Sequence, residues 1–74
     1  MSKLPPNVKP LALIKALGRL GFTEKKARGS HRRLVHPDGR WTQVAVHPKP
    51  IPAGTLRKIL RQIKLTIEKL EENL

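Results

Sequence analysis

Residues 31–47, HRRLVHPDGRWTQVAVH, decide the fold of this 74-residue chain because they contain two alternating segments joined by a turn. In a strand, every second side chain points to the same face of the sheet. The first segment alternates in this way around Leu34 and the second around Val44. Between them, the proline, aspartate and glycine of residues 37–39 supply the fixed φ, the side-chain cap and the positive φ of a tight turn. The stretch therefore predicts a β-hairpin.

The segments before the hairpin predict one helix and a third strand. Apolar residues at helical spacing follow Pro10, which is favourable in a first helical turn, and Gly21 is a natural stop. We therefore expect a helix over about residues 10–20. The short polar segment Phe22–Arg28 predicts an edge strand, and Gly29-Ser30 predicts the turn that leads into the hairpin.

The segments after the hairpin predict a second helix and a short helical tail. Prolines 48, 50 and 52 force an extended connection. A helix then opens at Gly54-Thr55, with one of these two residues near its N-cap. Its apolar stripe consists of Leu56, Ile59, Leu60 and Ile63. Thr66 is expected to cap the tail, where Ile67, Leu70 and Leu74 are candidates for packing.

The order of these elements predicts an α+β fold, α-β-β-β-α, in a single domain over residues 1–74. A three-stranded antiparallel sheet with both main helices on one face buries both apolar stripes and leaves the other face open. This is the layout of the double-stranded-RNA-binding domain, which alone does not establish function. Residues 1–9, which contain Pro5-Pro6, are expected to form a flexible arm.

The charge of the chain is its strongest compositional signal. Sixteen lysines and arginines face five acidic residues, so the formal net charge is +11. Three of the acids lie in the last seven residues, and residues 1–64 carry only Glu24 and Asp38 against fifteen basic residues. Such a body repels itself unless it meets a polyanion or an acidic partner. The balance is typical of a nucleic-acid-binding surface, with a merely solubilising surface as the alternative.

Other features of the composition exclude several classes of protein. The chain has no cysteine, which excludes disulfides and thiolate metal sites. The apolar run Leu11–Leu17 is broken by Lys15 and is too short for a signal peptide or a membrane span. The three histidines of the chain lack the spacing of a helical zinc motif and have no carboxylate pair beside them. We expect a cytoplasmic protein with no membrane partner, no metal site and no cofactor.

Several short motifs occur along the chain in a fixed order. They are Leu17…Leu20-Gly21-Phe22, Gly29-Ser30-His31, His36-Pro37-Asp38-Gly39-Arg40, Val46-His47-Pro48 and Gly54-Thr55-Leu56-Arg57-Lys58-Ile59-Leu60-Arg61-Gln62. Their order and spacing, which are more specific than any single motif, resemble those of the HicA toxin family. The resemblance covers roughly residues 10–70.

This resemblance implies a function as well as a fold. Members of the family are mRNA interferases of type II toxin–antitoxin systems, and a HicB antitoxin inhibits them. It implies that His31 is the catalytic histidine. The chain departs from the family pattern where Arg32 replaces a second histidine, at Trp41 where relatives more often carry a polar residue, and in the proline-rich loop after His47. The first departure removes one potential acid or base.

The residues around His31 independently suit metal-independent RNA cleavage. The RNA 2′-OH attacks the adjacent phosphorus when its proton is removed and the leaving 5′-oxygen is protonated, and an imidazole suits both transfers near neutral pH. Guanidinium groups can fork onto phosphate oxygens. The expected RNA-binding residues in this segment are Arg28, Gly29, Ser30, Arg32 and Arg33.

The start of the second helix is a further candidate contact because free N–H groups at a helix N-terminus bind anions. Thr55, Arg57 and Lys58 are the expected RNA-binding residues there. The alternative is that the charged residues only form the solvent-exposed face of the helix. For His36, a role in capping its turn is favoured over a catalytic role. His47 is a possible second proton-transfer group if it lies near His31. Trp41 is a candidate for base stacking, for core packing or for contact with a protein partner.

Two other functions fit the same composition. The first is a non-catalytic double-stranded-RNA-binding module with the same fold, in which the histidine is unused. The second is a basic subunit whose charge only docks an acidic partner. RNA cleavage in EDTA separates an enzyme from a binding module.

Overall fold

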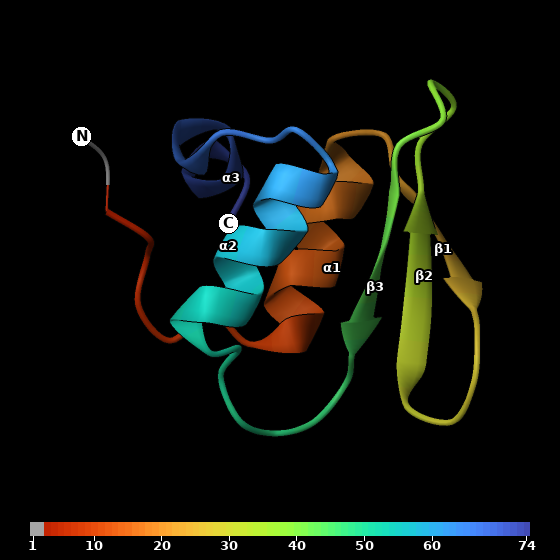
Figure 1. The fold of residues 1–74 in the computed structure, drawn as a ribbon, viewed down its shortest axis with the longest axis horizontal. Helices are drawn as coiled ribbons and strands as arrows, with labels where there is room; N and C mark the ends of the chain where they lie inside the picture. Colours follow the sequence, from red (N-terminus) through yellow and green to blue (C-terminus); the bar gives the residue numbers. More distant parts are fainter. Residues whose placement is uncertain (1–2) are drawn as a thin grey trace.

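The three strands form one antiparallel sheet, flanked by the helices. A computed structural model describes residues 3–74 (Figure 1). Its elements are α1 (Pro10–Arg19), β1 (Thr23–Lys26), β2 (His31–Val35), β3 (Trp41–Ala45), α2 (Ala53–Gln62) and α3 (Ile67–Glu72). The strand order is β1-β2-β3, so β1 is an edge strand as predicted. The predicted α+β class and the order of its elements are confirmed.

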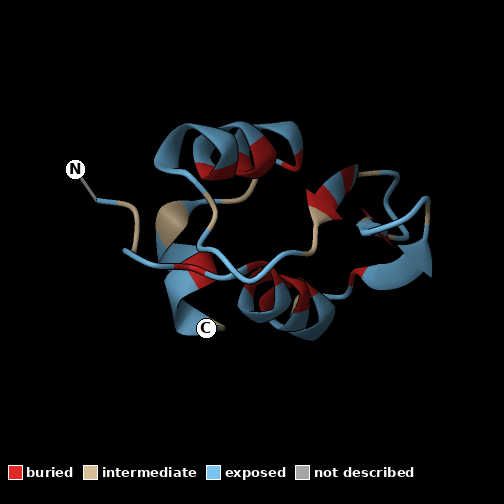
Figure 2. Cartoon of the chain, turned by 90° about the horizontal axis from the view of Figure 1, so that it is seen from below, coloured by how far each residue is buried: buried red, intermediate tan, exposed pale blue. Residues whose placement is uncertain are grey.

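The register of the hairpin decides which side chains enter the core. His31 pairs with Ala45 across the ladder, and Arg33 pairs with Gln43. The alternate positions point toward the helices, so Leu34 and Val44 are almost completely buried. Figure 2 shows the buried residues of α1, α2 and β3 facing one another in the middle of the molecule. The opposite side of the hairpin is left open to solvent.

The end of α1 corrects the predicted extent of the first strand. Gly21 adopts φ +97°, and the backbone N–H of Phe22 donates to Leu17 O at 2.9 Å while that of Gly21 donates to Gly18 O at 3.1 Å. These two bonds form a Schellman motif, which satisfies the last carbonyls of the helix. Phe22 is therefore used to end α1 and is buried in the core, and β1 is confined to Thr23–Lys26.

The start of α2 differs from the prediction of an N-cap at Gly54 or Thr55. The helix begins at Ala53, with Pro52 as N-cap and no capping side chain. Pro52 has φ −58° and its carbonyl accepts the N–H of Leu56 at 2.9 Å. The fixed φ of proline suits this boundary, so no hydroxyl cap is needed. The predicted apolar stripe of α2 and the Thr66 cap of α3 are both confirmed, whereas Leu74 is 49% exposed.

The segments on either side of the proline connection are tied together. β3 ends at Ala45, two residues before the predicted end, although the N–H of Val46 still donates to Ser30 O at 2.9 Å. Pro48 lacks an N–H and cannot continue the ladder. The N–H of Ile51 donates to Val8 O at 2.8 Å, and Val8 is buried. This bond joins the end of the predicted arm to the body, while residues 1 and 2 of that arm lie outside the described residues.

The turn at residues 36–40 is closed by its own side chains, as its composition predicts. The ring of His36 accepts the N–H of Asp38 at Nδ1, 3.1 Å away, and packs edge-on against Phe22. The backbone N–H of Arg40 donates to the Asp38 carboxylate, which lowers the pKa of that carboxyl. Arg40 Nη1 also donates to Ile63 O at 2.8 Å and so links the turn to the end of α2.

The central position of Leu34 makes it the most informative test of this core. We expect Leu34→Ala to reduce the free energy of unfolding by about 2–5 kcal/mol because a fully buried leucine leaves a cavity. Thermal unfolding followed by circular dichroism measures this loss. Leu11→Ala is the control, since Leu11 is 59% exposed and its loss should change stability by less than about 0.5 kcal/mol. Equal effects of the two substitutions would contradict the described core.

Candidate functional site

His31 is placed by a tight turn at the start of β2. The backbone N–H of His31 donates to Arg28 O at 2.8 Å and closes this turn. Gly29 has φ +52°, a backbone conformation that residues other than glycine rarely adopt. A Cβ at Gly29 would meet no atom within 4 Å, so the backbone angle, rather than crowding, requires glycine here. The side chain of His31 lies on the exposed side of the hairpin.

Arg32 lies on the opposite face of β2 from His31. Its Nη1 donates to Gly29 O and to His31 O, each at 3.1 Å, and its Nε lies 3.3 Å from the Glu24 carboxylate. The alternation of a strand causes this difference, because neighbouring side chains point to opposite faces. The guanidinium of Arg32 therefore holds the turn that positions His31, and its charge is shared with Glu24.

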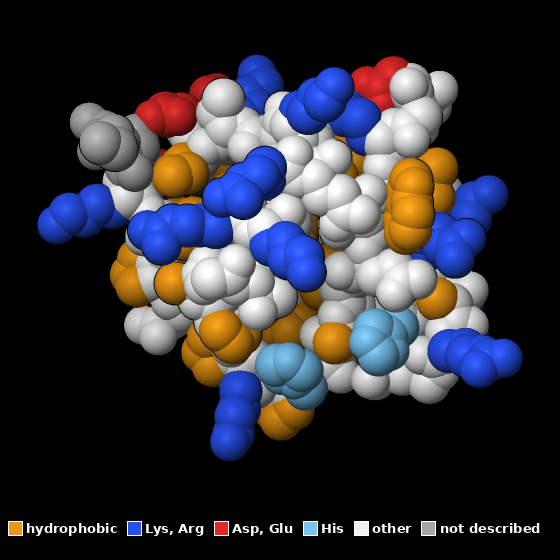
Figure 3. Space-filling view, in the orientation of Figure 1, with side chains coloured by type: hydrophobic (Ala, Val, Ile, Leu, Met, Phe, Trp, Pro, Cys, Tyr) orange, Lys and Arg blue, Asp and Glu red, His pale blue; other side chains and the backbone are white. Residues whose placement is uncertain are grey.

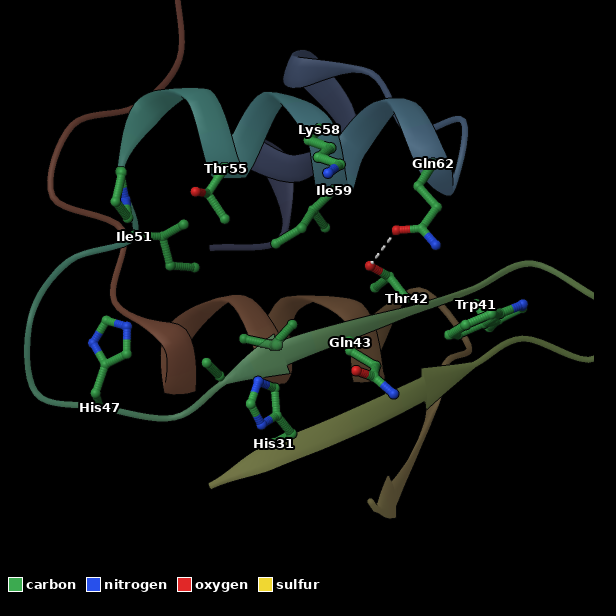
Figure 4. Close-up of a pocket in the computed structure, with 13 residues that line it drawn as sticks. His31, Trp41, Thr42, Gln43, His47, Ile51, Thr55, Lys58, Ile59 and Gln62 are labelled. Carbon is green, nitrogen blue, oxygen red and sulfur yellow. Dashed lines mark hydrogen bonds between the residues drawn. The ribbon is translucent and has the colours of Figure 1, made fainter. Parts of the chain in front are cut away.

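A groove with a cavity volume of about 630 Å³ runs between β3 and α2. Figure 4 shows His31 of β2 and His47 of the loop after β3 below the groove, and side chains of α2 above it. The lining combines apolar and polar side chains, as ligand sites do. The polar members include His31, Thr42, Gln43, His47, Thr55, Lys58 and Gln62.

The α2 wall of this groove is one face of the helix. Thr55, Lys58 and Gln62 follow one another at helical spacing of three and four residues. Gln62 is fixed in place because Thr42 Oγ1, which is buried on β3, donates to Gln62 Oε1 at 3.0 Å. This bond is drawn in Figure 4 and spans the groove at one end. It therefore sets the approach of α2 to the edge of the sheet.

A second hollow, of about 440 Å³, lies on the open face of the sheet. It is lined by Ala27, Arg28, His31, Arg33 and Gln43. His31 borders this hollow and the groove, so its imidazole lies where the two meet. Within residues 3–74, no aspartate or glutamate lines either hollow. In Figure 3, the histidine side chains visible on this face lie toward the lower edge of the molecule, and the visible acidic side chains lie along its upper edge.

The structure thus brings together some of the predicted site residues and separates others. Arg28 and Arg33 share the open-face hollow with His31, and Thr55 and Lys58 share the groove with it. Arg57 is exposed on α2 but lines neither hollow. The remaining predicted residues, Gly29, Ser30 and Arg32, line neither hollow: Gly29 and Ser30 form the turn before His31, and Arg32 lies on the opposite face of β2.

Two glutamines of the site were not predicted from the sequence. Gln43 lines both hollows, and Gln62 lines the groove. A signal for Gln43 exists in the alternation of β3, which places it on the face opposite buried Val44. For Gln62 the signal is its helical spacing from Lys58. His47, weighed as a second proton-transfer group, does line the same groove as His31, whereas the ring of His36 is used by its turn.

Clusters of metal-binding side chains and membrane-spanning helices are both absent from residues 3–74. No group of three or more histidine, cysteine, aspartate or glutamate residues in this part of the chain is arranged to hold a metal ion. Nor does any helix over the same residues have the length and apolar character needed to cross a membrane.

The fold and the site together define a basic α-β-β-β-α domain of the double-stranded-RNA-binding type, with a histidine that borders two hollows lined by Lys58 and by Arg28 and Arg33. A family model for the HicA toxin of bacterial toxin–antitoxin systems matches residues 12–65, which is most of the chain. The chain therefore belongs to the HicA toxin family. Its role is that of a toxin, and such a toxin has an antitoxin partner. No curated protein matches the chain.

The bonds of Arg32 generate a prediction about the turn that carries His31. We expect Arg32→Met to lower the free energy of unfolding by about 1 kcal/mol, since it removes two hydrogen bonds and a partly exposed ion pair. Faster amide exchange at Gly29 and His31 should accompany this loss, as measured by NMR. The matched control is Arg57→Met, which removes an exposed arginine of α2. If both variants are as stable as the wild type, Arg32 does not hold the turn.

Proposed function

We propose that this chain is a metal-independent endoribonuclease toxin that cleaves messenger RNA by general acid–base catalysis with His31. The observation that carries this proposal is the position of His31 where two hollows meet, with the cations Arg28, Arg33 and Lys58 around it. A phosphodiester that approaches this position meets an imidazole and permanent positive charge together. Membership of a toxin family supports a destructive activity.

RNA needs little from the protein for this reaction because it contains its own nucleophile. One imidazole removes the proton of the 2′-OH, and the new bond from the 2′-oxygen to phosphorus forms as the bond from phosphorus to the 5′-oxygen breaks. The leaving 5′-oxygen receives a proton, and the products are a 2′,3′-cyclic phosphate and a 5′-hydroxyl. Guanidinium and ammonium groups stabilise the charge that develops on the phosphate oxygens.

His47 is the residue best placed to make the second proton transfer. It follows Ala45, the ladder partner of His31, by two residues. Both histidines line the same groove, and Figure 4 shows both rings bordering it. We therefore assign one proton transfer to each imidazole.

The remaining predicted contacts divide into three groups. Arg28, Arg33, Thr55 and Lys58 hold the RNA backbone, because they line the two hollows next to His31. The free N–H groups at the start of α2 add to this phosphate contact. Gly29, Ser30 and Arg32 act through the turn, which brings the backbone close to the phosphate. Arg57 contributes long-range attraction from the exposed side of α2.

A HicB-type antitoxin is the expected inhibitor. Residues 1–64 carry fifteen basic residues against two acids, so an acidic protein is attracted to this body and competes with RNA. We propose that the antitoxin covers the open sheet face and His31. Inhibition then follows because the substrate and the antitoxin need the same surface.

His31→Ala tests the catalytic role directly. We expect the turnover of RNA to fall by about 10²- to 10⁴-fold, the usual contribution of general acid–base catalysis. RNA affinity should change little because permanent charges supply most of the binding, and stability should fall by less than about 1 kcal/mol because His31 is exposed. Cleavage of a labelled RNA in EDTA, with analysis of the product ends, measures turnover.

The control for that experiment is Leu11→Ala purified in the same way, which should retain wild-type activity. Cleavage by His31→Ala at the wild-type rate would refute the mechanism. A wild-type protein that binds RNA without cutting it would support the non-catalytic RNA-binding module instead.

The pH dependence of cleavage tests the role of His47. Two imidazoles that act as acid and base give a bell-shaped dependence of kcat/KM on pH. We expect His47→Ala to lose one limb of this profile and to reduce the rate by about 10-fold or more. A variant that keeps the full bell shape would show that His47 does not transfer a proton. Arg57→Met serves as the comparison, because it removes a charge outside the groove without changing a titrating imidazole.

A further inference from the structure

Trp41 is a large aromatic side chain that the fold does not bury. It begins β3, and 46% of its surface is exposed. The guanidinium of Arg33 lies over its ring, 5.3 Å from the ring centroid. This contact fixes the indole by a cation–π interaction and covers one of its faces. Arg33 therefore holds the ring of Trp41 at the surface, where part of it stays exposed to solvent.

The position of Trp41 connects this ring to the site of His31. Both residues line the groove between β3 and α2, and Figure 4 shows Trp41 at the far end of β3 from His47. Ala45 is the ladder partner of His31, and Trp41 precedes it by four residues on the same face. Four residues of a strand span about 13–14 Å. This span along the strand equals about four steps between stacked bases, at about 3.4 Å per step.

The charge around Trp41 favours a nucleic acid as its occupant. Arg33 lies over the ring, and Lys25 is the ladder partner of Arg33 and is exposed on the same face of the sheet. An aromatic ring beside cations is the combination with which proteins bind single strands, since bases stack on the ring while cations hold the phosphates. Trp41 and His31 also line the same groove.

We propose that Trp41 and Arg33 form a stacking platform for one base of the bound single-stranded RNA, within about four nucleotides of the scissile bond. This proposal rests on the proposed function, because it assigns the substrate of that site as unpaired RNA. Stacking tolerates every base, so the platform positions the strand along the groove without demanding one sequence. Trp41 is in this sense a positioning residue rather than a catalytic one.

Fluorescence offers a direct readout because Trp41 is the only tryptophan of the chain. The experiment uses the His31→Ala variant, in which cleavage is expected to be about 10²- to 10⁴-fold slower, and an unpaired RNA of about ten nucleotides, a length within the footprint of single-strand sites. We expect the RNA to quench the emission of Trp41 as a base stacks on the ring. Emission that stays unchanged when the RNA binds would overturn the platform.

The affinity of the same RNA tests what the stack contributes. Loss of one base–aromatic stack should weaken binding by about 5- to 100-fold, so we expect this range for Trp41→Ala in the His31→Ala background. Trp41→Phe should retain most of the affinity because it keeps an aromatic face. Leu11→Ala is the matched control, since it also removes an exposed apolar side chain and lies outside the groove. Equal affinities for Trp41→Ala and Leu11→Ala would overturn the proposal.

RNAs with a single abasic position locate the stacked base. Walking the abasic position along the strand should reveal one position, within about four nucleotides of the cut, at which Trp41→Ala causes no further loss. A loss from Trp41→Ala that is the same for every abasic RNA would contradict stacking on a base. If Trp41→Ala weakens only the antitoxin complex and leaves RNA affinity unchanged, the ring is a protein contact and the proposal is wrong.

These measurements separate the platform from the proposed function. If the wild type does not cut RNA, then quenching together with an affinity loss in Trp41→Ala would support the platform and refute the endoribonuclease. Cleavage by the wild type, together with an unaffected affinity in Trp41→Ala, would support the endoribonuclease and refute the platform.

Discussion

The burial of Leu34 and Val44 is the constraint on which the rest of this structure depends. Their side chains lie on the helix side of β2 and β3 and are almost completely buried. Because strand side chains alternate, this burial forces His31 and Arg33 to the exposed side. A slip of one residue in the register would place these two polar side chains in the core, at a large cost in desolvation. The core therefore selects the functional face as well as the fold.

The helix α2 serves the core and the site at the same time. One stripe, which includes Leu56 and Ile59, packs inward, while the adjacent face carries Lys58 into the groove. The bond from Thr42 to Gln62 joins this face to β3. A small domain buries a small fraction of its surface, so the same helix contributes to the core and to the site. The width of the groove consequently depends on the same packing that stabilises the domain.

The distribution of charge separates a cationic body from an acidic tail. Among the described residues, Glu24 is paired with Arg32 and Asp38 with Arg40, so the two acids of the body are engaged by neighbouring arginines. The other acids lie on α3, and no acidic side chain of the described residues lines the two hollows beside His31. The surroundings of His31 thus keep an uncompensated positive charge. This field attracts polyanions before any specific contact forms.

The sequence by itself determined the order of the elements, the hairpin, the apolar stripes and the basic character of the body. Each of these is a local property, since periodicity, turn residues and charge are set by near neighbours in the chain. Local patterns missed the first residue of α2, because a proline cap leaves no hydroxyl signal. Only the tertiary structure decided that His47, Gln62 and Trp41 share the groove of His31. The physical reason is that strand register and helix packing bring together residues that lie far apart along the chain.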